Sequence, residues 1–253
     1  MQLNALERGE GPPIILLHGL FGSAANLGIV ARGLAPHFTT WSLDVRNHGH
    51  SPHADSMSYP EMAADVLELM DAHDIISCPV LGHSMGGKIA MQLALDHPDR
   101  VSKLVVADVA PVTYPPHHHN ILKGLAAVEE ADIDSRSQAD ALLAATVPEA
   151  SVRAFLLKSL QKNEQGKYRW LLNRAAISDN YQLLGTANQG QAFDGSVLFI
   201  KGGDSDYILP EHQAAVLGFF PQAELKVIAG TGHWLHAEKP AIFNKLVLRF
   251  LLR

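Results

Sequence analysis

A serine between two glycines lies where an apolar run of the sequence gives way to a helical pattern. Gly82, Ser84 and Gly86 form the motif G-x-S-x-G. Between a strand and a helix, this motif holds a serine hydroxyl on a strained turn, where a substrate can reach it. A side chain at either glycine would collide with the strand or the helix, and glycine tolerates that close approach. The motif predicts a nucleophilic serine at position 84, and an ordinary glycine-rich turn is the alternative.

A histidine able to activate this serine follows the last predicted strand. A serine hydroxyl is a poor nucleophile at neutral pH, so it needs a histidine to accept its proton and an acid to orient that histidine. His233 lies between Gly232 and Trp234, and it comes last in the chain order serine, acid, histidine that such sites use. We therefore predict that His233 is the base, and we expect His236 to have a structural role.

Three aspartates compete for the place of the acid. Asp108 follows the strand after the serine helix, whereas Asp204 and Asp206 follow the next strand of the predicted sheet. All three keep the chain order. The pattern Gly203-x-x-Asp206-x-x-x-Pro210 resembles the acid loop of many hydrolases, which makes Asp206 attractive on spacing alone. Spacing does not decide between Asp108 and Asp206.

The elements that must position these side chains alternate along the chain. Continuous apolar runs suit strands buried on both faces, and apolar residues at helical spacing mark the helices between them. We predict strands over residues 13–17, 39–44, 75–81, 101–107, 196–200 and 223–228, and helices over residues 26–34, 60–73, 88–96, 210–220 and 240–251. This alternation predicts an α/β fold with a mostly parallel sheet, helices on both faces, and functional loops at the carboxyl ends of the strands.

Residues 111–192 interrupt the alternation. We predict helices over residues 121–130, 137–146, 149–161 and 170–177, with no strand between them. A structureless loop of this length is uncommon, so we expect a helical cap over the active site. The core would then comprise residues 1–110 and 193–253, and the cap insertion residues 111–192.

Composition narrows the classes of protein. A chain of 253 residues can form one α/β domain with an insertion. With 20 basic and 26 acidic side chains the net charge is −6, which argues against nucleic acid or an anionic membrane as the main partner. The single cysteine, Cys78, lies in an apolar run, so we expect a buried thiol and a cytoplasmic protein. The sequence has no signal-peptide pattern and no run of 18 apolar residues, so we expect no membrane span.

A polar segment, Asp44-Val-Arg-Asn-His-Gly-His-Ser51, directly follows a predicted strand. We expect Asp44 and Arg46 to form an ion pair and Gly49 to make a turn. The same segment, with the pattern D-x-R-N-H-G-x-S, is the most specific piece of a wider resemblance.

Four segments together carry this resemblance: residues 18–23, 44–51, 82–87 and 230–234. They resemble the bacterial YbfF-type esterases of the α/β-hydrolase superfamily, and the similarity covers essentially the whole chain. The resemblance implies an α/β-hydrolase fold. It also implies that the acid follows the strand after the serine helix, which favours Asp108 over Asp206.

Backbone N–H groups are expected to bind the oxyanion that forms when a serine attacks a carbonyl. One donor would be the N–H of Met85, directly after the nucleophile, and the other the N–H of Leu20, after His18-Gly19. We expect His18 itself to be a structural hydrogen-bonding group.

Apolar and aromatic side chains near these loops are candidates for an acyl pocket. They are Phe21, Phe155, Trp170, Tyr207 and Leu235. Residues 117–119 are three consecutive histidines, but neighbouring side chains on an extended loop point in different directions and no ligand cluster follows at fixed spacing. We expect a solvated loop there, and neither a metal nor another cofactor.

These residues predict a serine hydrolase that cleaves carboxylic esters or thioesters of small acyl substrates through an acyl-enzyme. One alternative is a C–C hydrolase or lyase of the same fold, which would bind a carboxylate-bearing substrate through cap cations such as Arg153, Lys158 and Arg174. The other alternative is a small-molecule binding protein without catalytic activity. The sequence leaves the acyl chain length, the physiological substrate and the oligomeric state open.

Overall fold

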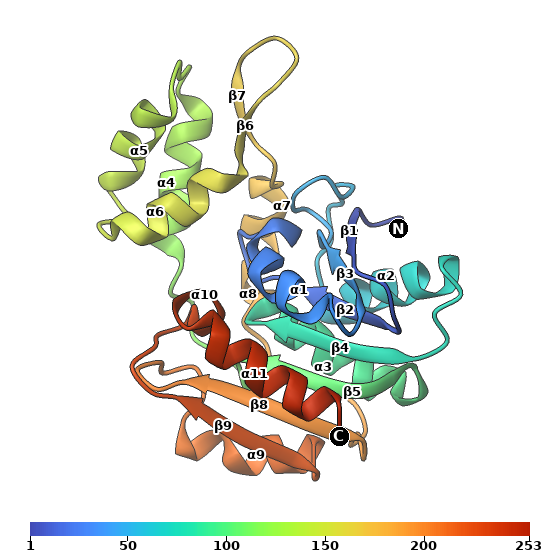
Figure 1. The fold of residues 1–253 in the computed structure, drawn as a ribbon. Coiled ribbons are helices and arrows are strands. Elements are labelled where there is room, and N and C mark those ends of the chain that lie inside the picture. The colour runs from blue at the N-terminus through green and yellow to red at the C-terminus, as the bar shows by residue number, and fades with distance from the viewer.

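A seven-stranded sheet forms the centre of the protein in a computed structural model that describes residues 1–253 (Figure 1). The strand order is β1-β3-β2-β4-β5-β8-β9, and all neighbouring pairs are parallel except β1 and β3. The strands are β1 (Ala5–Arg8), β2 (Pro13–Leu17), β3 (Thr39–Leu43), β4 (Cys78–His83), β5 (Val101–Ala107), β8 (Ser196–Gly202) and β9 (Ala223–Ile228). The predicted α/β-hydrolase fold with a mostly parallel sheet is confirmed.

The central strands form because their apolar runs are buried on both faces. In β2, the residues from Ile14 to Leu17 are all fully buried, as expected for a strand covered by helices on each side. β1 was not predicted from the sequence. It is an edge strand with three exposed residues in its four, so it carries no continuous apolar signal.

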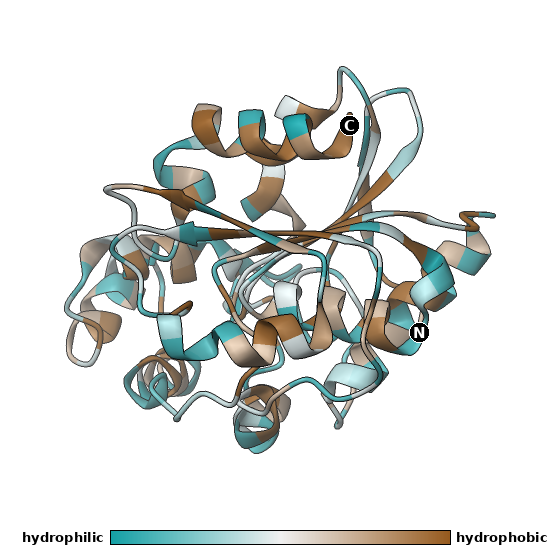
Figure 2. Ribbon diagram, turned by 90° about the horizontal axis from the view of Figure 1, so that it is seen from below, coloured by the Kyte–Doolittle hydropathy of each residue, from teal (hydrophilic) through white to brown (hydrophobic).

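Helices cover both faces of the sheet (Figure 2). On one face, α2 (Tyr59–Ala72) and α3 (Met85–Asp96) contribute to the larger apolar core, and on the other face α1 (Gly28–Leu34) and α11 (Pro240–Leu251) contribute to a separate one. The other helical elements outside residues 111–192 are short: η1 (Ala24–Leu27), η2 (Pro98–Arg100), η4 (Pro210–His212), α9 (Gln213–Phe219) and α10 (Leu235–Glu238). No helix combines the length and apolarity that crossing a bilayer requires.

No strand of residues 111–192 joins the large sheet. This insertion contains α4 (His119–Glu130), α5 (Arg136–Ala144), α6 (Ala150–Leu156), η3 (Leu157–Ser159), β6 (Leu160–Lys162), β7 (Tyr168–Trp170), α7 (Arg174–Asp179) and α8 (Tyr181–Leu184). In Figure 1, α4, α5, α6 and the hairpin stand away from the sheet, and α7 and α8 lead back to it. The division into a core of residues 1–110 and 193–253 and a cap of residues 111–192 stays a prediction.

The expectation of helices alone in this insertion is wrong. Leu160 pairs with Trp170 and Lys162 with Tyr168 in an antiparallel hairpin. The Asn163 side chain accepts hydrogen bonds from the N–H groups of Gln165 and Lys167, which closes the turn between the two strands. Local turn chemistry therefore overrides the helical spacing on either side.

Candidate active site

Ser84 occupies the sharp turn between β4 and α3. Its backbone has φ 54° and ψ −120°, a strained conformation of the kind that the surrounding structure must impose. A Cβ on Gly82 would lie 2.1 Å from the Gly86 carbonyl oxygen, and one on Gly86 would lie 2.2 Å from the Leu17 carbonyl oxygen. Both flanking glycines are therefore required by close backbone approach.

His233 lies between Ser84 and Asp108. Its Nε2 is 2.9 Å from Ser84 Oγ, and its Nδ1 is 2.8 Å from Asp108 Oδ2. A carboxylate accepts, so the Nδ1 proton points to Asp108 and leaves Nε2 free to accept the proton of the serine hydroxyl. The structure thus brings together the serine, the histidine and one of the three candidate acids, Asp108.

Asp108 is held at the end of β5 in a fully buried position. Its Oδ1 accepts a hydrogen bond of 2.9 Å from the N–H of Gly202, and its Oδ2 accepts a second hydrogen bond from the Ser205 hydroxyl. Asp206, by contrast, is exposed and makes no hydrogen bond to His233. Parallel neighbours β5 and β8 both end here, so sequence order alone could not show which loop faces His233.

Ser205 contacts the triad, although the sequence did not indicate a role for it. It is buried, and its hydroxyl donates to the same Asp108 oxygen that receives the His233 proton. Its position beside Gly202 and Gly203 marks only a turn, so no local pattern distinguishes it from an ordinary loop serine. Only the pairing of β8 with β5 places it against Asp108.

Tyr207 covers one face of the His233 ring. The two rings stack with centroids 4.0 Å apart and planes 20° from parallel. The Tyr207 hydroxyl lies 2.6 Å from His117 Nε2, and burial raises the pKa of Tyr207 to about 12. This neutral ring fixes the plane in which the imidazole can act.

Buried histidines surround the triad and stay neutral near pH 7. Burial lowers the pKa of His48 to about 3 and that of His236 to about 4, and it lowers the pKa of His18 and His83 as well. His83 Nε2 donates to the carbonyl oxygen of His233 at 2.8 Å. His18 Nε2 accepts from the Val45 N–H at 3.2 Å, the structural role that the sequence suggested.

Two free backbone N–H groups lie beside Ser84. Met85 is the first residue of α3, and an N–H in the first turn of a helix has no partner within that helix. In the loop after β2, the N–H of Phe21 donates to His48 and that of Gly22 to Gly19. The N–H of Leu20 makes no hydrogen bond within the protein. Leu20 and Met85 both border the cavity next to Ser84.

The expected ion pair between Asp44 and Arg46 is wrong. Arg46 Nε lies 2.6 Å from Asp65 Oδ2, on α2. Asp44 instead accepts hydrogen bonds from the N–H groups of Ala24 and His50, at 2.7 and 2.9 Å. Residues two apart share a face only within a strand, and Asp44 and Arg46 both follow Leu43, the last residue of β3, where the chain turns. The polar segment therefore supports the loops around the site.

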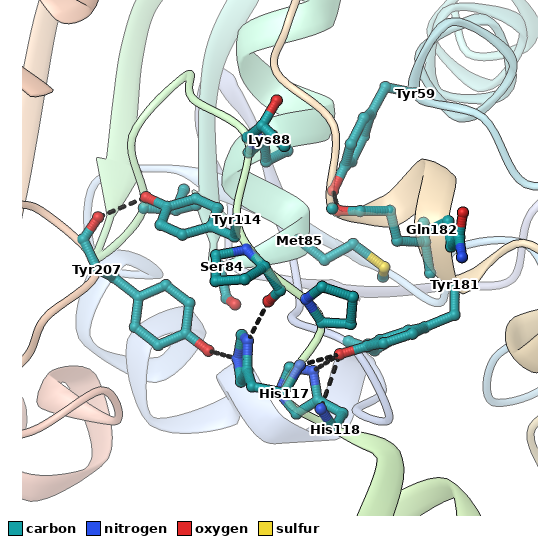
Figure 3. A pocket seen from close by; sticks show the side chains of 17 residues that line it. Tyr59, Ser84, Met85, Lys88, Tyr114, His117, His118, Tyr181, Gln182 and Tyr207 are labelled. Atoms are coloured by element: carbon teal, nitrogen blue, oxygen red, sulfur yellow. Dashed lines mark hydrogen bonds between the residues drawn. The ribbon is translucent and has the colours of Figure 1, made fainter.

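Two cavities meet at Ser84. Cavity A, of about 360 Å³, lies between α3 and the segments that connect the insertion, and its lining includes Leu20, Ser84, Met85, Lys88, Tyr114 and Tyr181 (Figure 3). Cavity B, of about 630 Å³, is lined by Ser84, His233, Phe21, Phe155 and Trp234 among others. Ser84, Leu20, His118 and Tyr207 border both cavities.

The predicted pocket residues divide into two groups. Phe21 and Phe155 line cavity B, and Tyr207 lines both cavities. Trp170 borders neither, because its indole N–H donates to the Leu125 carbonyl inside the insertion. Leu235 is fully buried in the apolar core on the α11 face. The prediction that Trp170 and Leu235 line the acyl pocket is therefore wrong, because apolar character alone does not distinguish a pocket wall from a packed core.

His118 and Lys88 border the site although the sequence did not point to them. The histidine segment was expected to be a solvated loop, yet His118 borders both cavities and burial lowers its pKa to about 3. Its Nδ1 lies 2.8 Å from the Tyr181 hydroxyl. Lys88 lies one turn after Ser84 in α3 and is almost completely buried. A lysine within the apolar first half of the helix was the available signal.

Comparison with known proteins shows the family of this chain. The α/β-hydrolase fold family matches residues 12–240. The chain is 42% identical to "Esterase YbfF" of Escherichia coli K12, over 98% of this chain and 96% of that protein. It is 40% identical to "sn-1-specific diacylglycerol lipase ABHD11" of Xenopus laevis, over 95% of this chain and 80% of that protein.

A solved structure described as "Marine microorganism esterase" is 38% identical and superposes with a TM-score of 0.97, covering 99% of this chain and all of that one. The chain therefore belongs to the α/β-hydrolase fold family, among its YbfF-type esterases.

Proposed function

We propose that this carboxylesterase cleaves its ester through a Ser84, His233 and Asp108 triad and an acyl-enzyme intermediate. His233 takes the Ser84 proton as the hydroxyl attacks the carbonyl carbon, and Asp108 stabilises the imidazolium that forms. His233 then protonates the leaving oxygen. Water activated by the same imidazole releases the acid from Ser84.

The observation that carries this proposal is the double contact of His233, with Ser84 on one ring nitrogen and Asp108 on the other. It supports Asp108 as the acid, since Asp206 is exposed to solvent. The free N–H groups of Leu20 and Met85 are the proposed oxyanion hole. Each such donor contributes about 2.7–4 kcal/mol to stabilising the transition state in known hydrolases.

The substrate class in this proposal is a small-molecule carboxylic ester, with thioesters included. Apolar side chains such as Phe21 and Phe155 line cavity B together with buried histidines that stay neutral and two charged residues, Lys158 and Glu238. This lining suits a weakly polar ligand. Names of the relatives support ester cleavage, since one is an esterase and another a diacylglycerol lipase.

The alternative C–C hydrolase or lyase would need cap cations that face the substrate. Arg153 lies 2.8 Å from Asp140, and Arg174 pairs with Glu129, so both charges are engaged within the insertion. Among these cap cations, Arg153, Lys158 and Arg174, only Lys158 borders a cavity next to Ser84. This arrangement supports ester hydrolysis over the alternative.

The test is hydrolysis of a 4-nitrophenyl acyl ester by the Ser84→Ala variant. In a triad that acts as a unit, losing the serine lowers kcat by about 10⁶. We expect turnover to fall to that degree while circular dichroism and the melting temperature stay close to those of the wild type. Unchanged turnover in the purified variant would refute the proposal.

A further inference from the structure

The proposed mechanism makes no use of the ammonium group of Lys88, yet this residue is 1% exposed. Lys88 lies one turn after the nucleophile, and its N–H donates to the Ser84 carbonyl at 3.1 Å. No carboxylate lies within ion-pair distance of its Nζ. A buried and unpaired ammonium is costly, and burial lowers the pKa of Lys88 to about 7. The hydrogen bonds of this side chain therefore indicate what it does.

Lys88 Nζ donates to two backbone carbonyls from opposite ends of the insertion. It lies 2.5 Å from the Val112 oxygen, just after β5, and 2.6 Å from the Thr186 oxygen, between α8 and β8. Neither carbonyl receives another hydrogen bond. The rings of Tyr59 and Tyr114 flank the ammonium, with centroids 5.7 and 5.2 Å away. One side chain thus joins both connections of the insertion to the helix that begins at the nucleophile.

Other contacts tie the two connections to each other, and Asn188 and Gln92 also join the second connection to α3, through the Lys88 and Gln189 carbonyls. The Tyr114 N–H donates to the Gly185 oxygen at 2.8 Å, and the Ala187 N–H donates to Thr113 Oγ1 at 3.1 Å. These residues lie along the wall of cavity A, where Thr113, Tyr114 and Gly185 all border it. The first connection is held to α3 through Lys88, so the distance between α3 and the Val112 side of this wall depends on the reach of the Lys88 side chain.

The position of His233 indicates which part of an ester cavity A would hold. His233 must protonate the leaving oxygen, and it lines cavity B but not cavity A. With the carbonyl oxygen directed to the Leu20 and Met85 N–H groups, the leaving group lies in cavity B. The acyl group is then left with cavity A. This step rests on the proposed function.

We propose that Lys88 is a positioning residue that sets the size of the acyl cavity, by holding both connections of the insertion at a fixed distance from α3. It touches no reacting atom. Its effect is on which acyl groups fit beside Ser84, and the leaving group in cavity B is outside its reach.

The experiment compares two series of esters. In the first, the 4-nitrophenyl leaving group is constant and the acyl group runs from acetyl to octanoyl. In the second, the acetyl group is constant and the leaving group runs from 4-nitrophenyl to naphthyl. Lys88→Met removes both hydrogen bonds of Nζ and frees the two connections to move away from α3. We therefore expect the ratio of kcat/KM for octanoyl over acetyl to rise by about tenfold, a difference of about 1.4 kcal/mol. The order of leaving groups should stay that of the wild type.

Lys103→Met is the matched control. Lys103 also donates to two backbone carbonyls, those of Phe250 and Leu251 at 3.2 and 3.0 Å, but it borders neither cavity A nor cavity B. Its loss removes the same kind of contact, so a general loss of stability would appear in both variants. A change of acyl preference should appear only with Lys88.

Lys88→Arg provides a second variant in case Lys88→Met does not fold. It keeps the charge and the donors on a longer and bulkier side chain, so it should narrow cavity A and shift the preference toward shorter acyl groups. A folded Lys88 variant with the acyl preference of the wild type overturns the proposal, and so does an equal shift in both ester series. If the wild-type protein cleaves no ester, or cleaves without Ser84, it is the proposed function that fails.

Discussion

Ser205 and His233 donate hydrogen bonds to the same oxygen, Oδ2 of Asp108. The other carboxylate oxygen is occupied by the N–H of Gly202. Three donors therefore fix the orientation of a carboxylate that solvent cannot reach. This arrangement keeps the Asp108 charge directed at the imidazole. Ser205 therefore helps to orient His233 through Asp108.

Replacing Ser205 with alanine should slow the reaction without weakening substrate binding. A hydrogen bond to a charged group contributes about 1.5–3 kcal/mol, so we expect kcat for a 4-nitrophenyl ester to fall about tenfold or more. KM should stay constant, because Ser205 borders neither cavity. Ser205→Thr keeps the hydroxyl and should retain most of the activity. A raised KM at constant kcat would contradict this role.

Two aspartate variants decide which acid belongs to the triad. Asp108→Asn keeps the shape of the side chain but loses the charge that holds His233 in its catalytic tautomer, so kcat should drop by about 10⁴. Asp206→Asn is the matched control and should leave turnover unchanged, because Asp206 is exposed and does not contact His233. Steady-state kinetics on both purified variants gives the answer, and the reverse result would move the triad to Asp206.

The acid illustrates what sequence could and could not predict. Ser84 and His233 lie in local motifs at the ends of apolar runs, so their positions at the active site could be predicted from the sequence. The competition between Asp108 and Asp206 was not, because it depends on how β5 and β8 lie beside each other. The family resemblance, and not the spacing, pointed to Asp108.

Long-range packing explains the other differences. The Asp65 partner of Arg46 comes from α2, 19 residues along the chain, and Lys88 meets carbonyls 24 and 98 residues away. No periodic pattern encodes such pairs. Trp170 and Leu235 have the same apolar character as Phe155, so only the fold separates core from cavity wall.

The elbow should tolerate no side chain at Gly86. A Cβ there would lie 2.2 Å from the Leu17 oxygen, in the backbone of β2. We expect Gly86→Ala to lower the free energy of unfolding by about 3 kcal/mol or more, at the upper end of overpacking effects. Gly218, in α9, has no atom within 4 Å of the position that a Cβ would take, so Gly218→Ala should stabilise the helix by up to about 1 kcal/mol. Urea unfolding of the two variants measures both changes.

The buried His236 should make stability depend on pH. Its pKa in the folded protein, about 4, is below the value of about 6.5 for an unfolded histidine. Below pH 6.5 the unfolded chain binds a proton that the folded chain does not. The stability from this residue is therefore complete above pH 6.5, and it is lost on acidification toward pH 4 by about 1.4 kcal/mol per pH unit.

His236→Gln should flatten that dependence. Urea unfolding at a series of pH values between 7 and 4 should show a smaller slope in the variant than in the wild type. His37→Gln is the control, because His37 is exposed and its loss uncovers no buried site. An unchanged slope in His236→Gln would mean that the folded protein accommodates the charged imidazole.

The most direct test of the central claim is to locate the nucleophile with a fluorophosphonate. The reagent is added to the wild-type protein and to His233→Gln, and the labelled peptide is identified by mass spectrometry. We predict one adduct, on Ser84 of the wild type, with loss of esterase activity in proportion to labelling and much slower labelling of the variant. Full labelling at another residue, or full esterase activity after Ser84 is labelled, would contradict the proposed triad.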